Sequence, residues 1–326
     1  MSVTILKATA AAIDGCDTTE AKVKPIKSGG SDRKYYRIQL ADGSSMIYMQ
    51  YTLERPDNIA FAPATKTLTR LRAPVPKMLA HDDKKHRIWL QDLGDDHLFD
   101  HRDSPWPKRR KFYKAVLDKV AKIHKTGADD LKEDELDHLE PAFNEEIFKW
   151  ERDYFFEHFL NHHSRRAPTY VRSLPKELEF TDLATFLSEQ PRSLIHRDLQ
   201  SQNILIKSGR PYLIDYQGLR LGLPEYDIAS LLYDPYVDFD DDERDELIAH
   251  AFKGRDEDEW RPRFYGCAAQ RLMQTLGAYC HIGHDLGRPE YLEYTTPALE
   301  NLREVLEIGA ILPRLAPYLS PEALQL

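Results

Sequence analysis

The stretch 194–206 constrains this chain more than any other part of its sequence. An apolar entry leads into a polar loop that contains Asp198 and Asn203. Two short apolar runs then flank the turn-forming residues Ser-Gly-Arg at 208–210, and Asp215 follows the second run. Apolar runs on either side of such a turn predict a hairpin. The two acids and the amide are therefore expected at strand ends that lie close in space.

The spacing of these residues matches H-R-D-x-x-x-x-N followed by a metal-binding aspartate, which is typical of kinase-like sites. Phosphoryl transfer requires positioning, Mg²⁺ and one acceptor for the hydroxyl proton, and Asp198 is the predicted acceptor. The amide oxygen of Asn203 and the carboxylate of Asp215 are hard ligands suited to Mg²⁺. The alternative is that Asp198 and Asn203 only cap a turn. We disfavour it because the loop, the hairpin and the second acid occur together.

Two departures distinguish the sequence from a protein kinase. Gln200 stands where a protein kinase usually has a lysine, and Asp215 is followed by Tyr-Gln-Gly. The segment between Asp215 and the helix-like residues 226–232 is too short for a long activation loop. A peptide would have no platform on which to lie, so the sequence favours a small-molecule acceptor.

Length and charge limit the classes of protein to which this chain can belong. The 326 residues, 41% of them hydrophobic, allow one large domain or two lobes with an ample core. A formal net charge of -9 disfavours nucleic acid and anionic membranes as partners. No apolar run is long enough to cross a bilayer and the first residues lack a secretion signal, so we expect a cytoplasmic protein. The three cysteines are odd in number and widely spaced, which suits reduced thiols.

The chain resembles the aminoglycoside phosphotransferase and choline kinase superfamily. Within it, the chain is most similar to the anomeric kinases of N-acetylmuramate and N-acetylglucosamine. The matching segments follow the expected order over nearly the whole chain: 29–37 (Gly-Gly-Ser-Asp-Arg-Lys-Tyr-Tyr-Arg), 91–95 (Gln-Asp-Leu-Gly-Asp), 196–203, 214–217 and 226–227.

The resemblance implies an α+β, bilobal, protein-kinase-like fold. Residues 1–93 would form an antiparallel-sheet N-terminal lobe that binds the nucleotide. Residues 94–326 would form a mainly helical C-terminal lobe for catalysis and substrate binding. The cofactors implied are ATP and Mg²⁺, and the partner is a small molecule, an amino sugar.

The first loop of the sheet is expected to cover the ATP phosphates. Gly29, Gly30 and Ser31 would bind them through backbone N–H groups, with Arg33 or Lys34 adding charge. A Gly-Gly-Ser loop by itself is a weak signal and is more often just a turn. Its place one hairpin into a sheet of alternating strands favours the binding role.

The resemblance also implies how adenine is held. The backbone near Gln91 and Leu93 would hydrogen-bond the base, and apolar side chains such as Met49 would flank the ring. For any one of these apolar residues, simple core packing is about equally plausible.

The third strand lacks the lysine that binds phosphates in protein kinases. The sequence has Tyr-Met-Gln at 48–50, and the following helix-like segment 58–72 contains no glutamate to pair with a lysine. Both halves of that ion pair are missing together. Arg33, Lys34 and Arg37 are then the candidate cations for the phosphates.

Four residues are assigned to the substrate by resemblance. They are Gln217 after the metal-binding loop, Glu151, Gln270 and Arg271. For Glu151, solvation at the surface is the expected role and a hydrogen bond to the sugar hydroxyls is the alternative. Gln274 replaces an expected lysine, which favours N-acetylglucosamine over the lactyl-bearing N-acetylmuramate.

Other interpretations remain open. A choline, amino-alcohol or aminoglycoside kinase of the same superfamily fits the catalytic motifs, and the missing lysine also suggests a nucleotide-binding pseudokinase. Asp227 is expected to anchor the catalytic loop. A zinc site built from Cys280, His281 and His284 with Cys267 is disfavoured, because one helix rarely presents all its ligands to one ion.

Overall fold

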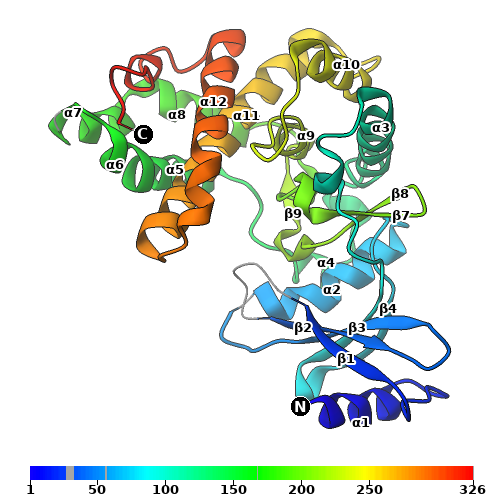
Figure 1. Cartoon of the computed structure of the whole chain (residues 1–326). Helices are drawn as coiled ribbons and strands as arrows, with labels where there is room; N and C mark the ends of the chain where they lie inside the picture. Colours follow the sequence, from blue (N-terminus) through cyan, green and yellow to red (C-terminus); the bar gives the residue numbers. More distant parts are fainter. Residues whose placement is uncertain (27–32, 56, 167, 326) are drawn as a thin grey trace.

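The chain has an N-terminal part built on one sheet and a larger helical part (Figure 1). The structure is a computed structural model that describes residues 1–26, 33–55, 57–166 and 168–325. This is the α+β arrangement expected from the sequence. The division of the chain after residue 93 stays a prediction.

The N-terminal sheet is fully antiparallel, with the strand order β1-β2-β3-β5-β4. Its strands are β1 (Lys22–Ile26), β2 (Lys34–Gln39), β3 (Ser45–Gln50), β4 (Met78–Asp82) and β5 (Arg87–Gln91). Two helices accompany the sheet, α1 (Ser2–Ala12) and α2 (Asp57–Arg70).

Neighbouring residues of β3 point to opposite faces of the sheet, and a different helix covers each face. Tyr48 lies in a buried cluster with Ile5 of α1. Met49, which points to the opposite face, is buried with Phe61 of α2. The N-terminal segment is therefore a helix packed against the sheet.

The remaining chain is mostly helical. Its helices are α3 (Trp106–Ile123), α4 (Glu133–Leu136), α5 (Glu145–Phe155), α6 (Asn161–His163), α7 (Pro168–Ser173), α8 (Leu178–Ser188), α9 (Pro224–Leu232), α10 (Asp241–Ala251), α11 (Glu257–Cys280) and α12 (Thr295–Gly309). Asn144 caps α5, and its Oδ1 accepts from the backbone N–H of Ile147 at 2.9 Å. Among the described residues, no helix combines the length and apolar character needed to cross a membrane.

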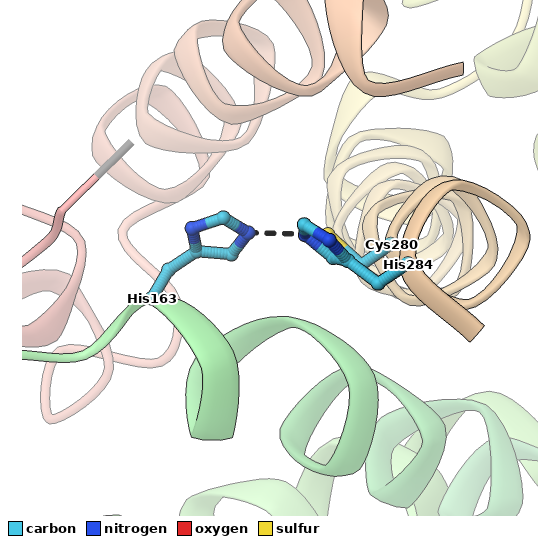
Figure 2. A group of neighbouring side chains, drawn as sticks. All are labelled: His163, Cys280 and His284. Atoms are coloured by element: carbon cyan, nitrogen blue, oxygen red, sulfur yellow. Dashed lines mark hydrogen bonds between the residues drawn. The ribbon is translucent and has the colours of Figure 1, made fainter. Parts of the chain in front are cut away.

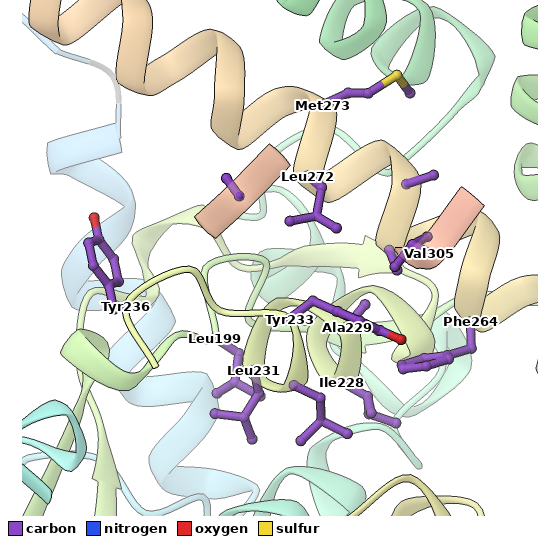
Figure 3. Packing of buried hydrophobic residues seen from close by; sticks show 14 of the residues in the cluster. Leu199, Ile228, Ala229, Leu231, Tyr233, Tyr236, Phe264, Leu272, Met273 and Val305 are labelled. Atoms are coloured by element: carbon purple, nitrogen blue, oxygen red, sulfur yellow. The ribbon is translucent and has the colours of Figure 1, made fainter. Parts of the chain in front are cut away.

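Helix α11 lies at the centre of the helical core. Leu272 of α11, Leu231 of α9 and Val305 of α12 belong to one buried cluster, which also contains Leu199 (Figure 3). Leu199 belongs to the polar loop of the 194–206 stretch and is completely buried. Its burial ties that loop to the core next to Asp198.

Two small sheets hold the ends of the same loop. Strand β6 (Ser193–Ile195) pairs with β9 (Arg220–Gly222), and β7 (Ile204–Lys207) pairs with β8 (Arg210–Leu213). The hairpin expected around the turn at 208–210 is confirmed. Gly209 there has φ +72°, a conformation that glycine adopts without strain.

Asp227 of α9 fixes the backbone of the loop. Its two carboxylate oxygens accept hydrogen bonds from the backbone N–H groups of His196 and Arg197, each at 2.7 Å. His124 Nε2 adds a third contact at 2.9 Å. Asp227 is completely buried, and a buried carboxylate is tolerated when such donors satisfy it. The predicted anchoring role is confirmed.

Replacing Asp227 with asparagine should destabilise the fold. The amide nitrogen cannot accept a hydrogen bond, so Asp227→Asn leaves a buried N–H donor unsatisfied, at about 1–3 kcal/mol per donor. We expect urea unfolding to show a loss of about 1–3 kcal/mol in the free energy of unfolding. The exposed Asp238 provides the matched control, since Asp238→Asn should stay within about 0.5 kcal/mol of the parent. Equal stability of the two variants would contradict the anchoring role.

Candidate active site

A cleft of about 530 Å³ lies between the sheet and the helical part. Its volume is in the range of small-molecule sites. The lining residues from the N-terminal part include Ile26, Arg33, Ile47, Leu90, Gln91 and Leu93. Those from the helical part include Gln200, Asn203, Leu205, Ile214, Asp215 and Tyr216.

Asp198 lies beside this cleft, between two arginines. Its Oδ2 accepts from Arg197 Nη1 and its Oδ1 from Arg271 Nη1, both at 3.0 Å. Arg197 has φ +76°, a conformation held by the Asp227 contact to its backbone. Burial raises the pKa of Asp198, but the guanidinium groups of Arg197 and Arg271 outweigh it and hold the pKa well below its usual range. Asp198 is therefore ionised, and with 24% of its side chain exposed it can accept a hydrogen bond.

Asn203 and Asp215 place two oxygen ligands at the cleft. Asn203 Nδ2 donates to the backbone oxygen of Asp198 at 3.0 Å, which orients the amide. Asp215 has φ +62° and a side chain that is 46% exposed. Gln217 Nε2 donates to Asp215 Oδ1 at 3.1 Å. One amide oxygen and one carboxylate form a donor pair that fits Mg²⁺.

The three candidate cations have different environments. Arg33 is buried, and its Nη2 lies 3.6 Å from Asp215 Oδ1. Arg37 is held by Asp92 and Asp95, whose oxygens it contacts at 2.6–3.2 Å. Lys34 is exposed and does not line the cleft. Arg33 is thus the candidate that faces the predicted metal ligands.

Helix α2 contacts the Asp215 loop through Tyr216. Phe61 stacks on Tyr216, with ring centroids 5.1 Å apart, and Thr65 Oγ1 lies 2.9 Å from the Tyr216 hydroxyl. Tyr216 directly follows Asp215. Aromatic stacking and one hydrogen bond therefore connect α2 to the Asp215 loop, where a protein kinase would use a lysine and a glutamate.

The predicted nucleotide residues separate into three groups. Gln91 and Leu93 line the cleft. Met49 is completely buried in the core and does not line it, so the expectation that Met49 flanks the base is wrong. Ile47, two residues earlier on the same face of β3, lines the cleft instead. Gly29, Gly30 and Ser31 lie outside the described residues.

The predicted substrate residues are only partly brought together. Arg271 contacts Asp198 and Gln217 contacts Asp215, so both are at the site. Gln270 is buried and its Nε2 donates to the backbone oxygen of Phe148 at 2.9 Å, which ties α11 to α5. A substrate contact from this bound amide is not supported.

Glu151 is completely buried, which corrects the expectation of a solvated surface residue. Its Oε1 accepts from the Tyr226 hydroxyl at 2.8 Å and lies 4.0 Å from Arg197 Nη2. Burial raises the pKa of Glu151 to about 7, although Arg197 and Tyr226 act against that rise. Glu151 is thus placed behind Arg197, where it can position the arginine that contacts Asp198.

Sequence reasoning missed a second anchor of the loop. Asp234 Oδ2 accepts from the backbone N–H of Ser201 at 2.7 Å, and Asp234 is buried. The available signal was a lone acid in the otherwise apolar stretch 231–237. Only the tertiary contact shows what that acid does.

Comparisons with known proteins agree with this geometry. A N-acetylmuramate/N-acetylglucosamine kinase of Pseudomonas aeruginosa is 26% identical, and the match covers 90% of this chain and 89% of that protein. The protein of the same name from Neisseria meningitidis is 24% identical over 87% of each chain. A solved choline/ethanolamine kinase family protein from Mesorhizobium loti has a TM-score of 0.63 at 16% identity, covering 98% of each chain. These findings confirm the expected kinase-like fold and the resemblance.

The family comparison extends over most of the chain. The model of the phosphotransferase enzyme family matches residues 22–263 of this chain. This range contains the sheet, the loop around Asp198 and the Asp227 anchor. The chain therefore belongs to the phosphotransferase enzyme family and is an enzyme that transfers a phosphoryl group to a hydroxyl acceptor.

Proposed function

We propose that the chain is an ATP- and Mg²⁺-dependent kinase that phosphorylates the anomeric hydroxyl of an N-acetylated hexosamine. The observation that supports this most is the pair of arginines on Asp198. Arg197 and Arg271 keep the carboxylate ionised and lower its basicity. A weak base is best matched to an acidic hydroxyl, and an anomeric hydroxyl is more acidic than other sugar alcohols.

The proposed role of Asp198 is to orient the acceptor. Its carboxylate would accept a hydrogen bond from the hydroxyl that attacks the terminal phosphate of ATP. The proton would pass to Asp198 late, once the new oxygen–phosphorus bond is forming. Positioning of the acceptor is then the main contribution of this residue.

Asn203 and Asp215 would hold Mg²⁺, which neutralises nucleotide charge when it is bound. Arg33 faces the same carboxylate and would contact the phosphates in place of the missing lysine. The base would lie between Ile47 and Leu205, two apolar residues that line the cleft from opposite sides. Gln91 and Leu93 at the end of the sheet would supply backbone contacts.

The positive charge around Asp198 also favours some of the alternative acceptors over others. Choline and aminoglycosides are cations, and Arg197 and Arg271 next to the reacting position would repel them. A neutral or acidic acceptor is favoured on this ground. The two related kinases named for N-acetylmuramate and N-acetylglucosamine support the same class of acceptor. The polar side chains of Gln217 and Gln274 could pair with its hydroxyl and acetamide groups.

Removal of the Asp198 carboxylate should slow the chemical step. Asp198→Asn keeps the shape of the side chain but cannot accept the proton, so kcat should fall by about 10²–10⁴-fold. ATP binding, measured by calorimetry, should be retained because the metal ligands and Arg33 are unchanged. The exposed Asp182 provides the control variant Asp182→Asn. Near-normal turnover of Asp198→Asn would refute the assignment.

A second experiment tests which cationic side chain binds the phosphates of ATP. One charge-assisted hydrogen bond contributes about 1.5–3 kcal/mol, so Arg33→Ala should raise KM for ATP by about 10–100-fold. KM for the acceptor should change little. Lys34→Ala, next to Arg33 but exposed, is the matched control and should leave KM for ATP unchanged. The opposite pattern would assign the phosphates to Lys34.

The acceptor itself can be tested by product analysis. With ATP and Mg²⁺, N-acetylglucosamine or N-acetylmuramate should give a product whose anomeric proton couples to phosphorus in NMR. The methyl glycoside of N-acetylglucosamine lacks the anomeric hydroxyl and should not react, because its O1 has no proton for Asp198 to accept. Phosphate on C6 of the sugar, or turnover of choline without turnover of either amino sugar, would contradict the proposal.

A further inference from the structure

A second group of chemically reactive side chains lies at the C-terminal end of α11. His163, Cys280 and His284 bring a ring nitrogen, a sulfur and a second ring nitrogen within 4.8 Å of one another. Figure 2 shows His163 on one side and Cys280 and His284 on the other, pointing toward each other. Cys280 Sγ and His163 Nε2 are 3.5 Å apart and hydrogen-bonded.

The group is formed by segments that are distant in sequence. His163 ends α6 and is 117 residues from Cys280. Cys280 is the last residue of α11, which continues as a π-helical turn over His281–Asp285. A second π-helical turn, Phe156–Leu160, immediately precedes α6. Such turns are rare and occur frequently at functional sites.

The accessibility of the three residues suits an ion that enters from solvent. Cys280 is buried, His163 is half-buried and His284 is exposed. His163 Nδ1 donates to the backbone oxygen of Gln325 at 2.8 Å, which leaves Nε2 of the same ring as the atom that can bind an ion. Cys267, which the sequence suggested as a possible member, is completely buried in a different cluster. The cysteine ligand is therefore Cys280 alone.

We propose that His163, Cys280 and His284 bind a zinc-type divalent cation. Two imidazoles and one thiolate are ligands that suit Zn²⁺, whereas Mg²⁺ and Ca²⁺ prefer oxygen. With Zn–S near 2.3 Å and Zn–N near 2.0–2.1 Å, tetrahedral geometry separates sulfur and nitrogen by about 3.6 Å. The 3.5 Å between Cys280 and His163 is close to that value. Water fills the fourth position, and the Cys280 proton passes to solvent on binding.

The bound ion would connect two helical segments that also carry residues close to Asp198 and Arg197. Helix α11 carries both Cys280 and Arg271, and α5, which leads into the turn before His163, carries Glu151. Cys280 lies nine positions after Arg271 along α11, a distance of about 14 Å. The ion is thus remote from the Asp198 carboxylate and has a structural role. This site does not depend on the identity of the sugar acceptor.

A neighbouring group is the competing location for an ion. Asp285 Oδ2 lies 3.0 Å from His158 Nδ1 and 2.8 Å from His281 Nδ1. The two ring N–H groups satisfy this carboxylate, and the group has no thiol. We therefore place the ion on the side of Cys280, with Asp285 supplying negative charge nearby.

The proposal is tested on the full-length protein with zinc and cobalt. Zn²⁺ should bind with one equivalent per chain in a chelator-competition titration and raise the Tm. Co²⁺ should give a thiolate-to-metal charge-transfer band. His284→Gln changes an exposed side chain, so the fold is kept, and it should weaken zinc binding by at least about 100-fold. Cys280→Ser should weaken binding similarly and abolish the charge-transfer band.

The matched control is His281→Gln, on the same turn but in the other group. It should leave zinc affinity and the cobalt band unchanged. If His281→Gln abolishes binding while His284→Gln does not, the ion lies at Asp285 and the proposal is wrong. No saturable zinc binding to the parent protein, or a cobalt spectrum without a thiolate band, would also overturn it.

Discussion

The active site depends first on the hydrogen bonds that Asp227 accepts from the loop backbone. A buried carboxylate gives two backbone N–H groups a partner they would otherwise lack, and it stabilises the left-handed conformation at Arg197. Asp234 does the same for Ser201 at the other end of the loop. With both anchors in place, the side chains of Asp198 and Asn203 leave the loop in fixed directions. The burial of Leu199 in the apolar core also holds the loop in place.

The charged side chains around Asp198 then determine its protonation state and its basicity. Asp198 has an arginine on each carboxylate oxygen, and Arg197 in turn has the buried Glu151 behind it. The two guanidinium groups keep the Asp198 carboxylate ionised at the cost of its basicity. An acceptor with an acidic hydroxyl suits such a site better than a cationic amino alcohol. The same two arginines are thus central to both the proposed mechanism and the proposed choice of substrate.

Helix α11 links features that are far apart in the chain. It brings Arg271 to Asp198, and through Gln270 it binds the backbone of α5. Its last residue, Cys280, belongs to the proposed zinc site with His163. An ion there would hold the ends of the two segments together without entering the cleft. On the sheet side, Phe61 and Thr65 of α2 reach the Asp215 loop through Tyr216. Packing there takes the place of the ion pair that protein kinases use.

The sequence alone determined the architecture and predicted the reacting centre, because those signals are local. The spacing of Asp198, Asn203 and Asp215, the hairpin turn at 208–210 and the alternation of the first strands depend on neighbouring residues. The anchoring role of Asp227 followed from its position in the motif. Tertiary structure decided what depends on contacts between distant segments. Such contacts buried Met49 and Glu151, engaged Gln270 with Phe148, and brought His163 to Cys280. Burial and charge pairing are properties of the packed chain, so no local pattern could assign these residues.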